Sequence, residues 1–352
     1  MNLFSSIRLR ELQLKNRIVV SPMCEYSAVE GHPQPWHLVH LGSRAIGGAG
    51  LVFTEATAVE ERGRISPADT GIYLDAHVDS WRPIATFVRE HGAVPGMQLA
   101  HAGRKGSTNV PWRGGKALPA GDGAWVPVAP SEIRFAEDYP APRALTLAEI
   151  ESVVKSFARA AERALAAGFE VVEIHSAHGY LLHEFLSPLA NQRTDEYGGR
   201  FENRVRLVVR VAEAIRKVWP ERLPLFCRIS ATDWKEGGWD LPQSIELAKL
   251  LRTAGVDLID TSSGGLVPDV KIPVAPGYQA PFAELIRKKA SIATGAVGMI
   301  TEPAQAEAIL AGGQADLIFL ARELLRDPYW PMRAAKRFGA AVHAPVQYER
   351  AW

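Results

Sequence analysis

Short apolar runs rich in β-branched residues alternate with longer segments of helical periodicity along most of the chain. The short runs predict eight strands, at Arg17–Met23, Gly50–Thr57, Val94–His101, Glu170–Ser176, Leu223–Ser230, Val256–Ser262, Ser291–Val297 and Asp316–Arg322. Amphipathic helices are clearest at Leu147–Ala167, Phe201–Trp219, Pro242–Ala254 and Pro303–Ala311, and Gly168, Gly255 and Gly312 stand just beyond three of their ends. A strand followed by a helix is therefore the repeating unit.

This order is typical of an α/β fold, in which a parallel sheet is either open and doubly wound or closed into a barrel. The first strand-to-helix turn lacks the GxGxxG phosphate turn of a dinucleotide-binding unit, so the closed form is favoured. We predict a single (β/α)8 TIM-barrel domain over residues 1–352, with Phe4–Leu14 as a short N-terminal plug. The Gly/Pro-rich stretch His101–Arg143 is then a long loop after the third strand.

Composition narrows the function classes. The chain is 47% hydrophobic with a net charge of +1, and no apolar segment approaches the roughly 18 residues that a bilayer span requires. The N-terminus has no secretory signal pattern, so we expect a cytoplasmic protein without membrane or nucleic-acid partners. Cys24 and Cys227 are the two cysteines, too few for a disulfide framework, a four-thiolate zinc site or an iron–sulfur cluster.

Polar side chains gather where the predicted strands end, which is where barrel enzymes place their chemistry. The fifth strand carries Arg228 on the same side as Phe226, a spacing that directs the guanidinium into the barrel mouth. A buried guanidinium needs a partner, because leaving it unpaired costs several kcal/mol. That partner is either an acceptor-rich cofactor in the barrel mouth or Glu173 on the neighbouring strand, and Arg228 could contact both.

The seventh and eighth strands are followed by glycines and by Arg322, at the position where many barrels bind a phosphate. The pattern favours a phosphorylated cofactor. The alternative is that Arg322 is an ordinary exposed arginine at the start of a helix.

The fourth strand ends in His175-Ser176-Ala177-His178, with Tyr180 two residues beyond His178. The histidine pair could be core or surface histidines, metal ligands, or hydrogen-bond donors to a substrate oxygen. No third histidine or cysteine stands at a recognisable ligand spacing, so we expect no metal and favour the donors. Tyr180 is either a proton donor to the substrate or a wall of the pocket.

Four longer motifs now bear on the assignment: SPMCEY, GMQLAHAGRK, EIHSAHGYLLHEFLSPLANQRTDEYGGRFENR and FLARELLRDPYWP. Together they resemble the old yellow enzyme family, over essentially the whole chain. Cys24 followed by Tyr26 resembles the bacterial, xenobiotic-reductase-like branch, which carries a cysteine near the flavin.

The resemblance implies an FMN-dependent NAD(P)H oxidoreductase, an ene-reductase that reduces activated carbon–carbon double bonds. The residues that would contact the FMN ring are Ser21, Pro22, Met23, Cys24, Ala56, Gln98 and Arg228, with the phosphate held around Gly298, Ala321 and Arg322. Arg228 would stabilise negative charge on the reduced ring, and Cys24 would tune the flavin potential. Relatives often have glycine at the position of Ala321, so a small effect near the phosphate is expected.

By the same resemblance, His175 and His178 would bind the nicotinamide of NADPH or NADH and then the activating oxygen of an enone or nitro substrate, which gives ping-pong kinetics. Tyr180 would protonate the α-carbon of the substrate double bond. Tyr26 would line the pocket, and Arg350 in the C-terminal QYERAW would reach the pocket of a neighbouring subunit, which implies a homodimer or homotetramer.

Two other functions compete with this interpretation. A phosphate-binding lyase or isomerase would use the histidine pair without flavin and would be colourless. A flavin-binding module without catalysis would turn over no enone. The larger dienoyl-CoA reductases, with an iron–sulfur cluster and further domains, are excluded by two cysteines and this length.

Overall fold

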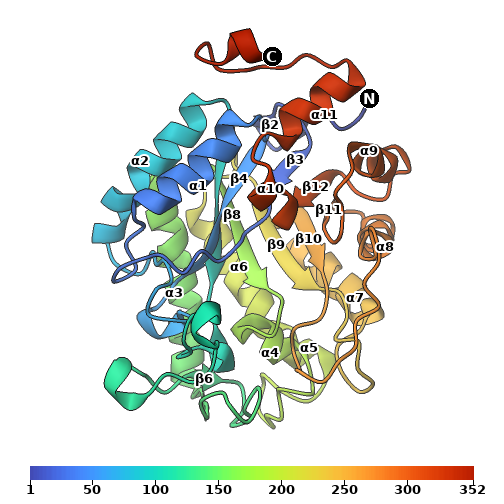
Figure 1. Ribbon diagram of the computed structural model, residues 1–352. Helices are drawn as coiled ribbons and strands as arrows, with labels where there is room; N and C mark the ends of the chain where they lie inside the picture. Colours follow the sequence, from blue (N-terminus) through green and yellow to red (C-terminus); the bar gives the residue numbers. More distant parts are fainter.

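The computed structural model describes residues 1–352 and contains a closed barrel of eight parallel strands (Figure 1). The strands follow one another around the barrel in chain order, as β3 (Ile18–Val20), β4 (Leu51–Ala58), β5 (Val94–Ala100), β8 (Val171–Ser176), β9 (Leu225–Ser230), β10 (Leu258–Ser262), β11 (Ala293–Ala296) and β12 (Leu317–Leu320). Each overlaps one predicted strand, and β3, β11 and β12 are markedly shorter than expected. The (β/α)8 TIM-barrel prediction is confirmed.

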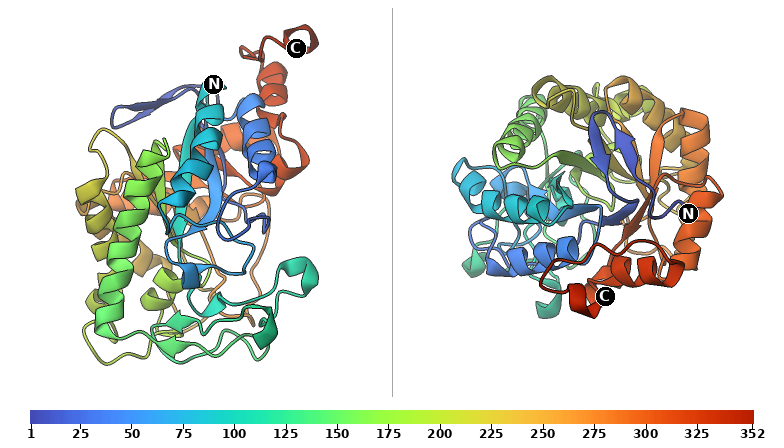
Figure 2. Two further views of the ribbon diagram at one scale, coloured as in Figure 1. Left: turned by 90° about the vertical axis from the view of Figure 1, so that its left-hand side faces the viewer. Right: turned by 90° about the horizontal axis from the view of Figure 1, so that it is seen from above.

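Helices surround the barrel in the view along its axis (Figure 2). They are α1 (Pro35–Ile46), α2 (Ala76–Glu90), α3 (Leu147–Ala166), α4 (Leu181–Leu186), α5 (Phe201–Arg204), α6 (Arg206–Val218), α7 (Leu241–Thr253), α8 (Ala280–Ala290), α9 (Pro303–Ala311), α10 (Arg322–Arg326) and α11 (Trp330–Phe338). No helix combines the length and the apolarity that crossing a membrane requires.

One segment predicted to be a continuous helix is interrupted in the structure. The segment Phe201–Trp219 is divided into α5 and α6, and the break falls at Val205, whose ψ of −15° tightens the turn. The preceding Arg204 is buried, and its guanidinium donates hydrogen bonds to the carbonyl oxygens of Gly199 and Leu186. These tertiary hydrogen bonds pull the chain inward, an effect that the helical periodicity could not reveal.

The three glycines expected just beyond helix ends all stand there, but their backbone conformations differ. Gly168 and Gly255 follow α3 and α7 with φ of +94° each, the left-handed conformation that glycine favours. After α9, however, the left-handed residue is Gly313 with φ of +67°, whereas Gly312 keeps right-handed geometry.

The N-terminal segment closes one end of the barrel, as predicted. Strands β1 (Ile7–Leu9) and β2 (Leu12–Leu14) form an antiparallel hairpin that lies across the barrel end in the right-hand view of Figure 2. Leu9 and Leu14 pack into the apolar interior of the barrel. The hairpin therefore covers side chains that would otherwise face water.

The barrel separates two apolar clusters. The interior cluster includes Phe53, Phe226 and Phe319, while Cys227 belongs to the larger cluster between the strands and the helices. The alternation along β9 therefore directs Phe226 and Arg228 inward, as the strand periodicity predicted.

The long loop after β5 contains 3-10 turns at Gly103–Lys105, Pro111–Arg113 and Ala120–Asp122 and the short paired strands β6 (Val128–Ala129) and β7 (Arg143–Ala144). In Figure 1 β6 lies at the same end of the barrel as α4, and both chain termini lie at the opposite end. His175, near the end of β8, and His178, in the loop that follows, are thus on the side that the long loop covers.

Candidate functional site

Three aromatic rings converge just beyond β8. The ring centroids of His175 and His178 lie 5.2 Å apart, and those of His175 and Tyr180 lie 5.0 Å apart, with both pairs edge to face. His175 is buried, whereas His178 and Tyr180 are half-buried. The predicted histidine pair and the predicted proton donor therefore share one face of the barrel mouth.

The turn that carries His178 is held by its neighbours. His178 has φ of +59°, a conformation that non-glycine residues rarely adopt. Its backbone N–H donates to Oγ of Ser230 at 3.0 Å, its Nε2 lies 2.7 Å from Oγ of Ser262, and Nζ of Lys105 donates to its carbonyl oxygen at 2.8 Å. Three elements thus fix the imidazole in an otherwise unfavourable backbone conformation.

Gly179 continues the same turn with φ of +74°, and a Cβ added there would lie 2.2 Å from the carbonyl oxygen of Gly265. Its N–H donates to Nδ1 of His183 at 2.9 Å. Glycine is therefore required here both by conformation and by space.

Gly179→Ala is expected to destabilise the fold by about 2–5 kcal/mol, since the left-handed conformation costs about 1–2 kcal/mol and displacement of the neighbouring backbone adds about 1–3 kcal/mol. Gly199→Ala is the matched control, because Gly199 has φ of +76° with no atom within 4 Å of an added Cβ. Urea unfolding measures both. Equal losses would show that the contact with Gly265 is unimportant.

Both histidines are held neutral. Burial lowers the pKa of His175 and of His178 well below the usual range, and the Arg228 guanidinium adds to the effect. Nδ1 of His175 is buried without a hydrogen-bond partner. A neutral imidazole has one donor and one acceptor nitrogen, so this atom is available to a bound group.

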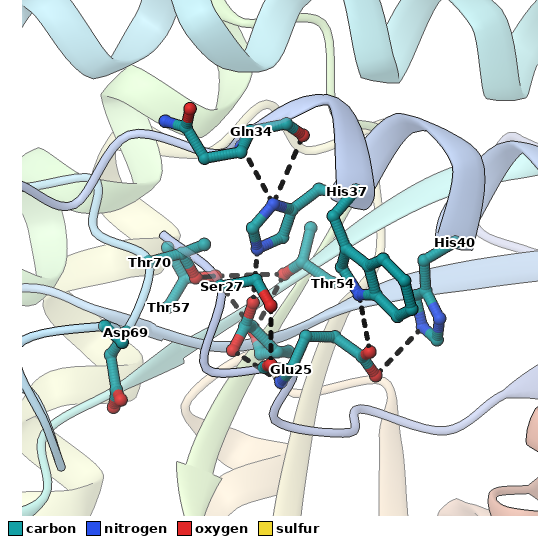
Figure 3. A network of polar contacts seen from close by, with 12 residues as sticks. Glu25, Ser27, Gln34, His37, His40, Thr54, Thr57, Asp69 and Thr70 are labelled. Carbon is teal, nitrogen blue, oxygen red and sulfur yellow. Dashed lines mark hydrogen bonds and ion pairs between the residues drawn. The ribbon is translucent and has the colours of Figure 1, made fainter. Parts of the chain in front are cut away.

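A buried polar network fixes the loop after β3 (Figure 3). The N–H of Glu25 donates to Oε2 of Glu55 at 3.0 Å, and Oε1 of Glu55 lies 2.9 Å from Nε2 of His37. Nδ1 of His37 accepts from the N–H of Gln34, so the His37 proton is on Nε2 and points at the carboxylate. Glu55 therefore ties the residue after Cys24 to β4 and to α1.

Sequence reasoning missed Glu55, although a carboxylate inside an otherwise apolar strand is a signal of a buried partner. It stands next to Ala56, at an irregularity in the pairing of β4 with β5. Ala56, Cys24 and Tyr26 are brought together here.

Cys24 is half-buried on this loop, as are the flanking Pro22, Met23 and Tyr26. Burial raises the pKa of the Cys24 thiol, and the carboxylates of Glu55 and Asp69 raise it further. The thiol therefore stays protonated at neutral pH and is a weak donor rather than a thiolate nucleophile.

Arg228 has a protein partner, but the sequence named the wrong one. Its Nε lies 3.0 Å from Oδ2 of Asp260 on β10, and Glu173 instead accepts a hydrogen bond from Nε2 of Gln98 at 2.7 Å. The reason is register, since β9 aligns Arg228 directly with Asp260 but aligns Phe226 with Glu173.

The positively charged side chain of Arg322 is exposed to solvent beyond the ends of β11 and β12. Arg322 forms no salt bridge, and its Nη2 lies 3.9 Å from the thioether sulfur of Met299. Gly298 beside it has φ of +116°, and Ala321 precedes the first turn of α10. Arg322 is thus an exposed arginine at the start of a helix, as the alternative interpretation held. The same exposure leaves its guanidinium accessible to an anion.

Two observations bear on whether the residues suit FMN. Oγ of Ser21, one of the predicted flavin contacts, is buried without a partner, as is Nδ1 of His175, which is predicted to bind the nicotinamide and the substrate. An acceptor-rich ring would satisfy such atoms, and Arg322 would meet its phosphate. The residues present therefore fit the cofactor.

Arg350 does not join this group within its own chain. It is exposed in the C-terminal segment, at the barrel end opposite to β6 and α4 (Figure 1). No set of three or more histidine, cysteine, aspartate or glutamate side chains is arranged to hold a metal ion.

A cavity of about 380 Å³ opens beside Tyr26, whose ring packs edge to face on Trp112 at 5.8 Å. A larger cavity of about 940 Å³ reaches Pro67 and Ala68 from a second direction and contains none of the predicted site residues. Of the two cavities, the smaller one is therefore the one lined by a predicted site residue, Tyr26.

Comparison with known proteins gives consistent results. A profile of the NADH:flavin oxidoreductase / NADH oxidase family matches residues 2–339. NADPH dehydrogenases of Geobacillus sp. (strain WCH70) and Bacillus subtilis (strain 168) are 52% and 49% identical, each over 99% of this chain and over 98% and 99% of their own.

Among solved structures, morphinone reductase has a TM-score of 0.80 at 28% identity, covering 97% of this chain and 91% of its own. The old yellow enzyme homologue from Zymomonas mobilis has a TM-score of 0.80 at 28% identity, covering 98% and 95%.

Proposed function

The chain belongs to the NADH:flavin oxidoreductase / NADH oxidase family, and among its members to the old yellow enzymes, and from this premise we propose that it is an ene-reductase. The protein is an FMN-dependent NAD(P)H oxidoreductase. Its substrates are small α,β-unsaturated carbonyl or nitro compounds, and NADPH is the reductant, as the names of its bacterial relatives indicate.

When bound, FMN would be the hydride carrier between the nicotinamide and the β-carbon of the second substrate. The chain holds it with Ser21, Gln98 and Arg228 around the ring, and with Arg322 and the backbone near Gly298 at the phosphate. Pro22, Met23, Cys24, Ala56 and Ala321 complete the surface. Cys24 donates a weak hydrogen bond as a protonated thiol, since its pKa is raised.

His175 and His178 bind the oxygen of the activating group. Because both imidazoles are neutral, each offers one N–H, and two donors on one carbonyl or nitro oxygen stabilise the negative charge that develops there as hydride arrives. The same donors bind the nicotinamide amide, so the two substrates use the pocket in turn.

Tyr180 then donates the proton to the α-carbon. Burial raises the pKa of its phenol above the usual range, so the proton is present at neutral pH. Nζ of Lys105 lies 5.5 Å from the centroid of the Tyr180 ring, and burial lowers the pKa of this amine to about 7, so its protonated form would stabilise the phenolate left after transfer.

Tyr26 lines the substrate pocket, and Arg350 of a second copy completes it in a homodimer or homotetramer. The C-terminal segment that carries Arg350 lies at the barrel end opposite to α4 and β6 (Figure 1), which supports a second copy as the source of this arginine. A cytoplasmic location suits an enzyme that consumes NADPH.

The observation that carries the proposal is the convergence of two neutral histidines and a protonated tyrosine at the barrel mouth. The experiment records the visible spectrum of the purified protein, adds NADPH without oxygen and then adds cyclohexenone. We expect a yellow protein that bleaches and then regains its colour.

A preparation that stays colourless after FMN is supplied would contradict the proposal and would favour the lyase or isomerase. A yellow protein that bleaches but does not recover with any enone or nitro compound would instead indicate a flavin-binding module without this activity.

A further inference from the structure

A layer of buried polar side chains crosses the barrel interior between the phenylalanine cluster and the histidine pair. Four neighbouring strands contribute Gln98, Glu173, Arg228 and Asp260, which are 1%, 0%, 5% and 0% exposed. Strand register places Gln98 opposite Glu173 and Arg228 opposite Asp260. The layer thus holds two carboxyl groups and one guanidinium away from water.

The contacts within the layer are unequal. Glu173 accepts a neutral hydrogen bond from the Gln98 amide through Oε1, and its Oε2 has no hydrogen-bond partner. Oδ2 of Asp260 lies 3.0 Å from Nε of Arg228, but the Nε–H is not directed at the carboxylate. Both carboxylate oxygens of Asp260 are therefore without a hydrogen bond. The positive charge therefore neighbours Asp260, and Glu173 has only an amide beside it.

The other groups around the layer add no charge. His175, next along β8, is neutral because its burial lowers its pKa, and Cys227 on β9 points outward with its thiol pKa raised by burial. On the strands that flank the layer, β4 aligns Ala56 with Gln98 and β11 aligns Gly295 with Asp260, and neither residue carries a charge.

Two ionised carboxylates with one guanidinium would leave a net negative charge in this dry interior, which is strongly unfavourable. Burial and then the neighbouring Asp260 raise the pKa of Glu173, and Arg228 only partly opposes the rise. Arg228 also opposes the effect of burial on the pKa of Asp260. One proton therefore belongs to the pair, and Glu173 is its favoured holder.

We propose that Glu173 is a protonated, neutral acid and that Asp260 is the ionised counter-charge of Arg228. By acting through Arg228, Asp260 lowers the midpoint potential of the bound FMN. This inference rests on the proposed place of the cofactor above Arg228. Asp260 is a positioning residue, because it acts through the arginine. By compensating the guanidinium, it limits how strongly Arg228 favours the negative charge that FMN gains on reduction, and so keeps the cofactor a strong reductant.

The test compares Asp260→Asn with Glu173→Gln in protein reconstituted with FMN, and measures the midpoint potential against a reference dye. Asp260→Asn is expected to favour reduced over oxidised FMN about tenfold, a rise of about 30 mV for a two-electron couple. Glu173→Gln exchanges one neutral group for another and is expected to leave the potential unchanged, as is Asp260→Glu, which keeps the carboxylate. A purely structural role for Asp260 would not shift the potential in one direction.

Equal rises in the two amide variants would show that Glu173 is ionised, and no rise in Asp260→Asn would remove its role; either result overturns the inference. If the protein retains no FMN, the proposed function fails instead. In that case the stability of the protein without cofactor still tests Glu173.

Because the pKa of Glu173 is raised in the fold, its contribution to stability is complete below its unfolded pKa of 4.5 and is lost as pH rises through the folded pKa. Glu173→Gln is expected to flatten this decline in the unfolding midpoint above pH 4.5. Parallel pH curves for the two proteins would overturn the assignment of the proton.

Discussion

Tyr180→Phe slows reoxidation of the reduced enzyme by an enone by about 100-fold or more, in the range typical for the loss of a positioned general acid. The variant removes one hydroxyl and keeps the ring that packs edge to face on His175 at 5.0 Å. Substrate binding through the histidine pair should therefore survive. Stopped-flow mixing of reduced protein with cyclohexenone measures the rate.

Reduction by NADPH is the internal control for this prediction, because that step needs no proton from Tyr180 and should keep its rate. Tyr73→Phe is the matched control variant, since Tyr73 is also half-buried but packs against His77 at 4.6 Å, away from the histidine pair. An unchanged rate of reoxidation in Tyr180→Phe would remove Tyr180 as the acid and leave it as a wall of the pocket.

Asp233→Ala is expected to lower the free energy of unfolding by about 3–5 kcal/mol, because it strips a buried carboxylate from a set of donors. Oδ2 of Asp233 accepts from Oγ of Ser187 at 2.6 Å and from the N–H of Trp239 at 2.7 Å. Oδ1 lies 2.9 Å from Nε2 of His183, which carries the ring proton because Nδ1 accepts from Gly179. All of these donors would be left in a dry environment.

Urea unfolding measures the loss, and Asp79→Ala provides the matched control. Asp79 pairs with Arg82 at 2.5 Å, but its side chain is 77% exposed, so its removal should change stability by no more than about 0.5 kcal/mol. Asp233→Ala should also impair turnover, since His183 supports the turn at Gly179. A loss near that of the exposed control would show that water replaces the carboxylate.

Much of the fold could be predicted because it depends on local patterns. The eight strands, the plug and the inward direction of Arg228 all follow from periodicity within a few residues, which the printed sequence displays directly. The division of Phe201–Trp219 could not be predicted, because it depends on Arg204 reaching carbonyl oxygens in distant segments.

The site divides in the same way. His175, His178 and Tyr180 are close in sequence, so their convergence needed only one strand and one turn. The partner of Arg228 depended on the register between β9 and β10, and Glu173 and Asp260 are equally plausible from sequence alone. Likewise, the hydrogen bond from the N–H of Glu25 to Glu55 joins the loop after β3 to β4, next to an irregularity in the pairing of β4 with β5 that has no sequence signature.

Closure of the barrel has a consequence for how the chain folds. The last strand, β12, pairs with the first, β3, so that Ile318 lies beside Ile18. During synthesis β3 therefore waits, with an unsatisfied edge, for a partner made some three hundred residues later. Long-range pairing of this kind slows folding and exposes partly folded chains to aggregation. A chain that ends before β12 should accordingly expose two open sheet edges and depend on chaperones to stay in solution.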